Sequence, residues 1–266
     1  MPSLVEILII ALATYGFFVA FALLAADWVI FRARRPGYRD GARITKIQAD
    51  DGVPISALHL RPRVERRGIV LFLHGNAEDL GDLLPRLEEF QSRGYSVLAI
   101  DYRGYGTTPG RPNEVNVVAD SAVALRHLCA VEGVAPGDVM LYGRSMGGGP
   151  AVVLATRERV GALILDGAFT SAFRVVTRVA ILPCDRFPNI DRISAVRCPV
   201  LLIHGTTDRT VPFAHGRRLL AAAPPGTAHL WVDGAGHNDL VEVAGETYWQ
   251  AIGRVAAGVP ARGRSA

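Results

Sequence analysis

One serine of the sequence lies in a setting suited to a nucleophile. Ser145 is the centre of the pattern Gly-Arg-Ser-Met-Gly at residues 143–147, which follows the apolar run 139–142 and opens an apolar stretch through residues 151–154. A strand, a sharp turn and a helix in this order form the nucleophile-elbow arrangement. Glycines suit such a turn, because the serine backbone is strained and neighbouring Cβ atoms would clash. We expect the Ser145 hydroxyl to project at the start of a helix.

A serine hydroxyl needs a base near neutral pH, and an imidazole has a suitable pKa. His237 is the expected base, because it follows the last predicted strand in a Gly-Ala-Gly loop. Asp208 is the preferred partner to hold the imidazole tautomer. Asp166 could replace Asp208 geometrically, whereas Asp239 is too close to His237 in sequence. We expect structural roles for His74, His204 and His215, and find no supporting context for His59, His127 and His229.

A tetrahedral intermediate also needs hydrogen-bond donors aimed at its oxyanion. The backbone N–H of Met146 follows the nucleophile directly, and the backbone N–H of Asn76 lies in the loop after the predicted strand 68–73. We expect these two amides to form the oxyanion hole. Because the amide direction matters more than the side chain, Asn76→Ala should be milder than Ser145→Ala.

The elements that must position these residues alternate along the chain. An opening antiparallel hairpin is predicted at residues 44–48 and 55–60, around the turn Asp50-Asp51-Gly52. Longer amphipathic stretches, such as 80–93 and 115–131, then alternate with short apolar runs at 68–73, 96–100, 139–142, 162–165, 200–203 and 229–232. Such runs are buried on both faces, which predicts an α/β fold with a mostly parallel, doubly wound sheet. Ligands bind such sheets at the carboxyl ends of the strands, where the candidate residues lie.

The N-terminal segment is typical of a membrane anchor. Residues 7–26 carry no charge and are long enough to cross a bilayer. Trp28 and Tyr38 follow, together with a cluster of arginines formed by Arg32, Arg34, Arg35, Arg39 and Arg43. The positive-inside rule keeps this flank cytoplasmic. We predict a single-pass anchor with its flank over residues 1–35 and a cytoplasm-facing catalytic domain over 36–266, in a bacterial inner membrane. A cleaved signal peptide is the alternative, although the basic start and shorter apolar run that it needs are missing.

Composition excludes several classes of protein. The 266 residues are 50% apolar and 20% charged, which is typical of a folding chain with one sizeable core. The net charge of +4 comes without a stripe of basic and aromatic residues, so we expect no nucleic-acid partner. Cys129, Cys184 and Cys198 are an odd number and indicate thiols in a reducing compartment. No spacing indicates a metal site, and we expect no cofactor.

Four motifs together resemble a known family. They are His-Gly-Asn-Ala-Glu-Asp at 74–79, Asp-Tyr-Arg-Gly-Tyr-Gly at 101–106, Gly-Arg-Ser-Met-Gly-Gly at 143–148 and Phe-Pro-Asn-Ile-Asp-Arg-Ile at 187–193. The resemblance, over residues 44–255, is to the α/β-hydrolase-domain serine hydrolases. It is strongest to the membrane-associated branch that includes eukaryotic depalmitoylating thioesterases and serine-aminopeptidase-like bacterial relatives. It implies an α/β-hydrolase fold and a triad at Ser145, Asp208 and His237, in the chain order of that fold.

The chain departs from this family at its front. The eukaryotic thioesterases attach through a palmitoylated, cysteine-rich N-terminus, whereas this chain has no cysteine before Cys129. Residues 167–198 would form a short lid, whose apolar side chains either pack in the core or line a pocket for an acyl chain. The expected function is hydrolysis of carboxylic esters or thioesters, of acyl or lipid-linked substrates, through an acyl-enzyme. The alternatives are a serine aminopeptidase and a catalytically inactive, membrane-bound interaction protein.

Overall fold

A computed structural model describes residues 2–177 and 185–259 of the chain. Within these residues, eight strands form one sheet in the order β1-β2-β4-β3-β5-β6-β7-β8. The strands are β1 (Ile44–Gln48), β2 (Pro54–Leu60), β3 (Gly68–Leu73), β4 (Tyr95–Ile100), β5 (Val139–Arg144), β6 (Ala162–Asp166), β7 (Val200–Gly205) and β8 (Ala228–Val232). β1 and β2 form the expected hairpin and β2 also pairs antiparallel with β4, whereas all other neighbours are parallel. The predicted mostly parallel sheet is confirmed.

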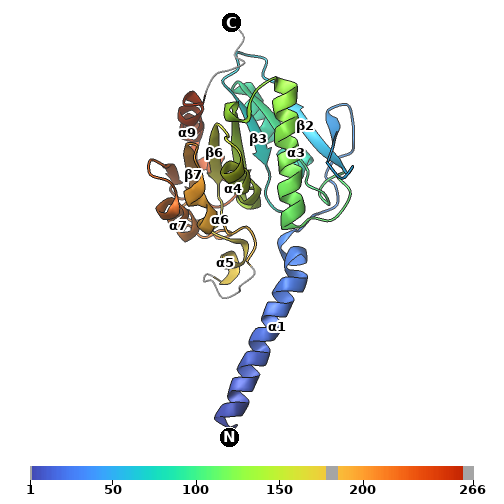
Figure 1. The fold of residues 1–266 in the computed structure, drawn as a ribbon. Helices are drawn as coiled ribbons and strands as arrows, with labels where there is room; N and C mark the ends of the chain where they lie inside the picture. The colour runs from blue at the N-terminus through green and yellow to red at the C-terminus, as the bar shows by residue number, and fades with distance from the viewer. Residues whose placement is uncertain (1, 178–184, 260–266) are drawn as a thin grey trace.

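Helices cover both faces of this sheet (Figure 1). The α-helices that follow β2 in the chain are α2 (Leu80–Ser92), α3 (Glu114–Glu132), α4 (Gly148–Arg157), α5 (Ala172–Thr177), α6 (Asn189–Arg192), α7 (Ala214–Ala222), α8 (Leu240–Ala244) and α9 (Glu246–Ala257). Of these, α5 lies beyond the end of the sheet (Figure 1). Successive side chains of a strand point to opposite faces. Val70 therefore packs in the core formed with α2 and α9, and Leu71 packs in the core formed with α3 and α4. The central strands are buried on both sides, which explains their unbroken apolar sequences.

The N-terminal helix α1 (Leu4–Ile30) projects away from the rest of the molecule (Figure 1). Its 27 residues correspond to about 40 Å of helix. The window Leu4–Phe21 has a mean hydropathy of 2.3, and none of it is buried. By length and composition this helix could cross a membrane, although a signal sequence would have the same properties. The helix is longer than the apolar segment 7–26, because its last turns continue through polar Asp27.

The junction between α1 and the sheet is packed. Phe31 is buried, and its ring lies edge-on against that of Phe187 at 6.1 Å between centroids. Asp27, in the last turns of α1, forms an ion pair with Arg186 at 3.2 Å. Residues before and after position 35 contact the body of the molecule. The domain boundary expected at residue 35 stays a prediction.

The described part of the expected lid, residues 167–198, contains α5, α6 and a short 3₁₀ turn at Ile193–Ala195. Phe169 and Phe187 are buried in the core. These two side chains follow the first of the two alternatives, packing in the core. Cys184 and the apolar positions among 178–184 lie outside the described residues.

Candidate active site

Ser145 lies at the turn between β5 and α4, in a backbone conformation that few side chains adopt. Its φ is +50°, in the left-handed region. The flanking glycines have no room for a side chain: a Cβ on Gly143 would lie 2.6 Å from the carbonyl oxygen of Gly147, and a Cβ on Gly147 would overlap the carbonyl oxygen of Leu73. The sequence therefore folds here into the strand, sharp turn and helix that were predicted.

His237 connects this serine to a buried carboxylate. The Nε2 atom of His237 lies 3.0 Å from the Oγ of Ser145, and its Nδ1 lies 2.7 Å from the Oδ2 of Asp208. Both separations are hydrogen-bond distances. Asp208 is held in turn, because its Oδ1 accepts the backbone N–H groups of Thr210 and Val211, each at 2.8 Å. The structure thus brings Ser145, His237 and Asp208 together from the loops after β5, β8 and β7.

The other two aspartates considered from the sequence have different partners. Asp166, at the end of β6, accepts hydrogen bonds from the hydroxyls of Tyr142 and Tyr248 and is buried. The Oδ1 of Asp239 accepts the backbone N–H of Gly236 at 2.7 Å. Asp166 was a plausible alternative because it ends a strand. Its side chain instead accepts hydrogen bonds from one tyrosine of β5 and one of α9.

The histidines expected to be structural are held by the backbone around them. His74 Nδ1 contacts the carbonyl oxygen of Gly75 at 2.7 Å, and His204 Nε2 contacts that of Val211 at 2.8 Å. His215 Nδ1 accepts the backbone N–H of Thr170 at 3.2 Å. Burial lowers the pKa of His74 to about 4 and that of His215 to about 4, so both rings are neutral near pH 7.

The loop that carries Asn76 passes next to the serine. A Cβ on Gly75 would lie 3.3 Å from the Cβ of Ser145, and Met146 is buried directly after the serine. Within the described residues, the backbone N–H of Asn76 has no protein acceptor. The Oδ1 atom of the Asn76 side chain accepts the Tyr105 hydroxyl at 2.8 Å. The placement is compatible with the expected oxyanion hole, whose function stays a prediction.

A charged network that the sequence reasoning missed lies beside the serine. Arg144 forms an ion pair with Glu78 and donates a hydrogen bond to the Oδ1 of Asn238 at 2.9 Å. The other oxygen of Glu78 accepts the backbone N–H of Gly75 at 2.9 Å. The network thereby connects three loops that meet at Ser145. In the sequence Arg144 directly precedes Ser145, and Asn238 directly follows His237. These positions next to the catalytic candidates were the signal that could have revealed the network.

These loops enclose a cavity of about 490 Å³. It is lined by Arg34, Gly75, Asn76, Ala77, Glu78, Asp82, Arg144, Ser145, Thr210, His237 and Asn238. Most of these residues are polar or charged, and none of them comes from the expected lid. Among residues 2–177 and 185–259, no group of three or more His, Cys, Asp or Glu side chains is arranged to hold a metal ion.

A mostly parallel sheet of this order, with a serine on the strand-to-helix turn after β5, defines an enzyme of the α/β-hydrolase class. Solved structures have the same fold: an esterase of Pyrococcus furiosus superposes with a TM-score of 0.68 at 19% identity, covering 84% of this chain and 98% of that one. An esterase of Exiguobacterium antarcticum gives a TM-score of 0.62 at 17% identity, covering 79% of this chain and 98% of that one. The predicted α/β-hydrolase fold is confirmed.

Sequence comparison gives the family. The chain is 37% identical over 225 residues to human α/β-hydrolase domain-containing protein 17B, covering 83% of this chain and 76% of that one. It is 38% identical over 205 residues to protein 17C of Xenopus tropicalis, covering 76% of this chain and 66% of that one. The chain belongs to the α/β-hydrolase domain-containing protein 17 family. Residues 64–182 also match the family described as serine aminopeptidase, S33. The matched region spans only about two thirds of the length of the Xenopus relative.

Proposed function

We propose that this enzyme hydrolyses carboxylic esters or thioesters through a covalent acyl-enzyme at Ser145. The observation that carries the proposal is the chain of hydrogen bonds from Ser145 Oγ through His237 to Asp208. Its geometry is that of a nucleophile, a general base and a carboxylate that holds the base.

Each group has its own role in the proposed reaction. His237 Nε2 takes the proton of the Ser145 hydroxyl while Oγ attacks the acyl carbonyl carbon. Asp208 accepts the hydrogen bond of Nδ1–H and stabilises the imidazolium that forms. The backbone amides of Asn76 and Met146 would stabilise the oxyanion, a contribution of about 2.7–4 kcal/mol for each such donor.

Collapse of the tetrahedral intermediate completes the first half of the reaction. The bond from the carbonyl carbon to the alcohol or thiol breaks, and the leaving group takes the proton from His237. Water then attacks the acyl-serine with His237 as base again, releasing a carboxylic acid and the free serine.

A lipid-linked substrate is favoured by where the cavity lies. Arg34, which lines the cavity, is the fourth residue after the end of α1. If α1 spans a bilayer, the cavity lies close to the membrane surface, where an acyl chain on a lipid or a lipidated protein is available. We further propose a single-pass topology with the catalytic domain in the cytoplasm, because the arginine-rich flank follows α1 directly.

A fluorophosphonate probe tests the proposed nucleophile. We expect the probe to label the folded wild-type enzyme at Ser145, and the Ser145→Ala variant to be neither labelled nor active on chromogenic esters and thioesters. Heat-denatured wild type is the control for nonspecific labelling. Absence of labelling in the folded wild type, or equal turnover by the variant, would refute the assignment.

Protease protection tests the proposed topology. In sealed right-side-out vesicles, the catalytic domain should resist added protease until detergent is present. Digestion of the domain from the outer face would contradict the cytoplasmic orientation.

A serine aminopeptidase is the second candidate, and one feature of the cavity favours it. The carboxylates of Glu78 and Asp82 line the same cavity as Ser145, and an aminopeptidase needs an acidic group for the amino group of its substrate. Glu78 forms an ion pair with Arg144. Asp82 forms a longer one with Arg34, at 3.7 Å, and its side chain is 53% exposed. Comparing turnover of aminoacyl anilides with that of acyl esters decides between the two. If anilides are the better substrates and Asp82→Asn raises their KM, the peptidase assignment replaces the esterase one.

A further inference from the structure

The segment that follows α1 is bonded to the loop proposed to stabilise the oxyanion. We call residues 30–38 the anchor flank and residues 75–79 the oxyanion loop. The Asn76 side chain connects them: its Nδ2 donates to the carbonyl oxygen of Ile30, and its Oδ1 accepts the backbone N–H of Arg32 at 2.7 Å. The carbonyl of Ile30, at the end of α1, is one that helix geometry leaves without a partner. The Asn76 side chain therefore caps the C-terminal end of α1.

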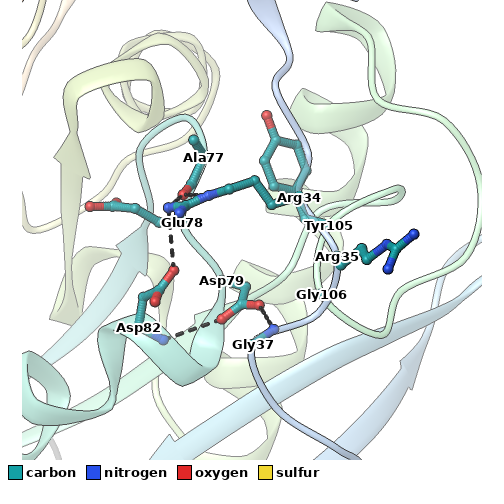
Figure 2. Close-up of a pocket in the computed structure, with 9 residues that line it drawn as sticks. All are labelled: Arg34, Arg35, Gly37, Ala77, Glu78, Asp79, Asp82, Tyr105 and Gly106. Atoms are coloured by element: carbon teal, nitrogen blue, oxygen red, sulfur yellow. Dashed lines mark hydrogen bonds and ion pairs between the residues drawn. The ribbon is translucent and has the colours of Figure 1, made fainter.

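The next residue of the oxyanion loop is held by the anchor flank as well. The Nε of Arg34 donates to the carbonyl oxygen of Ala77 at 2.7 Å, and its Nη2 contacts the same oxygen. Further along, the backbone N–H of Gly37 donates to the Oδ2 of Asp79 at 2.6 Å. Figure 2 shows Arg34 reaching across to Ala77 and Gly37 lying against Asp79, while Arg35 points away from both. Three residues of the oxyanion loop thus form hydrogen bonds with the anchor flank, which lies more than forty positions earlier in the chain.

The oxyanion loop needs support of this kind. Ala77 has a φ of +60°, a left-handed conformation that a residue with a side chain keeps only when its surroundings impose it. The loop lies between β3 and α2, outside regular structure. An oxyanion donor stabilises a transition state only when it is held within about 0.5 Å of its productive position.

We propose that Arg34 and the Asn76 side chain are positioning residues that hold the oxyanion loop on the anchor flank. This inference rests on the proposed function, because it concerns the same site. It makes the membrane-proximal segment part of the catalytic apparatus. Attachment to the membrane and stabilisation of the oxyanion then depend on the same short stretch of chain.

The test compares two neighbouring arginines in the full chain, reconstituted in lipid nanodiscs. Arg34→Ala removes the donors to Ala77 together with the longer ion pair to Asp82, and Asp82→Asn removes that ion pair alone. Arg35→Ala removes the same charge from the same flank, and no hydrogen bond from the Arg35 side chain is found among the described residues. Arg34→Lys keeps a donor that can reach the Ala77 carbonyl. Because Arg34 is an exposed side chain, its variants should fold. Asn76→Ala, with a melting curve to check its folding, probes the other contact between loop and flank, the one with Ile30 and Arg32.

We expect Arg34→Ala to lower kcat for an ester about 10- to 100-fold with little change in KM, because a misaligned donor weakens transition-state binding. Binding of a trifluoromethyl ketone, whose hemiketal mimics the oxyanion, should weaken by a similar factor. Arg34→Lys should restore part of both losses, and Arg35→Ala should behave as wild type. Equal effects of Arg34→Ala and Arg35→Ala, or unchanged ketone binding, would overturn the proposal.

Hydrogen exchange separates this proposal from the proposed function. Amide exchange in peptides covering residues 74–82 should be faster in Arg34→Ala than in Arg35→Ala. Unchanged exchange overturns the positioning role whatever reaction the enzyme catalyses. Faster exchange with unchanged kcat overturns its catalytic part. An inactive wild type that is not labelled at Ser145 refutes the proposed function instead, and the catalytic part of this inference with it.

Discussion

Gly167 lies against the ring of His237. A Cβ on Gly167 would come within 3.0 Å of the His237 Cε1 atom and 3.2 Å of its Nδ1 atom. Gly167 follows β6 directly and has a φ of +59°, so both its conformation and its neighbour favour a residue without a side chain. The end of β6 therefore forms one wall of the imidazole site.

Gly167→Ala should displace the imidazole and lower activity. We expect kcat to fall about tenfold or more, because a shift of the base misaligns proton transfer. The unfavourable φ should also lower the free energy of unfolding by about 1 kcal/mol. Gly133→Ala is the matched control, because Gly133 has a φ of +66° and open space around its Cβ position. If both variants lose stability and neither loses kcat, His237 is not constrained by Gly167.

The variants Asp208→Asn and Asp166→Asn test which of the two carboxylates is the third member of the triad, a choice that the sequence left open. Asp208→Asn should lower kcat about 10³- to 10⁴-fold, since the amide favours the wrong tautomer of His237. Asp166→Asn should instead lower the free energy of unfolding by about 1–3 kcal/mol, because the hydroxyls of Tyr142 and Tyr248 lose a charged acceptor. Steady-state kinetics and denaturant unfolding of each variant give the answer. The reverse pattern would place Asp166 in the triad.

Asp101 should make stability depend on pH. Its carboxyl is buried between His74 and Tyr38, and burial raises its pKa to about 7, above the value of about 3.9 in an unfolded chain. A raised pKa means that the native state keeps a proton that the unfolded state has lost. This contribution to stability is fully present below about pH 4 and is lost as the pH rises through about 7, by up to about 1.4 kcal/mol per pH unit.

The effect of Asp101 is isolated by comparison with Asp101→Asn. His74 acts in the opposite direction over part of the same range, because burial lowers its pKa to about 4. Because His74 Nε2 lies 3.5 Å from Asp101 Oδ1, the two groups are coupled, and the comparison is repeated in a His74→Asn background, where no imidazole titrates at that position. Urea unfolding between pH 4 and 8 should therefore show the variant gaining stability relative to wild type as the pH rises. A difference that does not vary with pH would contradict the raised pKa.

The ion pair between Glu78 and Arg144 should couple the oxyanion loop to the nucleophile turn. Glu78→Gln and Arg144→Met should each lower kcat/KM, and the double variant should lose less than the product of the two. We expect a coupling energy of about 0.5–3 kcal/mol, typical of residues in contact. Independent effects of the two substitutions would show that the pair does not act as a unit in catalysis.

Local patterns in the sequence determined most of the fold. The apolar runs predicted the buried strands because a strand covered on both faces excludes polar side chains. The parallel sheet followed from their alternation with amphipathic stretches. The pattern around Ser145 predicted the strand, turn and helix, since the glycine requirement there arises from clashes within a few residues and with the adjacent strand. The predicted hydrolase fold and family were confirmed, whereas the catalytic roles of Ser145, Asp208 and His237 stay predictions.

Only the tertiary structure decided the contacts between distant segments. It paired Asp208 with His237 and turned Asp166 toward two tyrosines, a choice between two strand ends that look alike in sequence. It also joined the Asn76 side chain to the end of α1, whereas from the sequence we expected only a backbone role for that residue. Periodicity and turn preferences act over a few residues and can be read along the chain. Hydrogen bonds between loops depend on how the sheet and its helices pack, which is why they required the folded molecule.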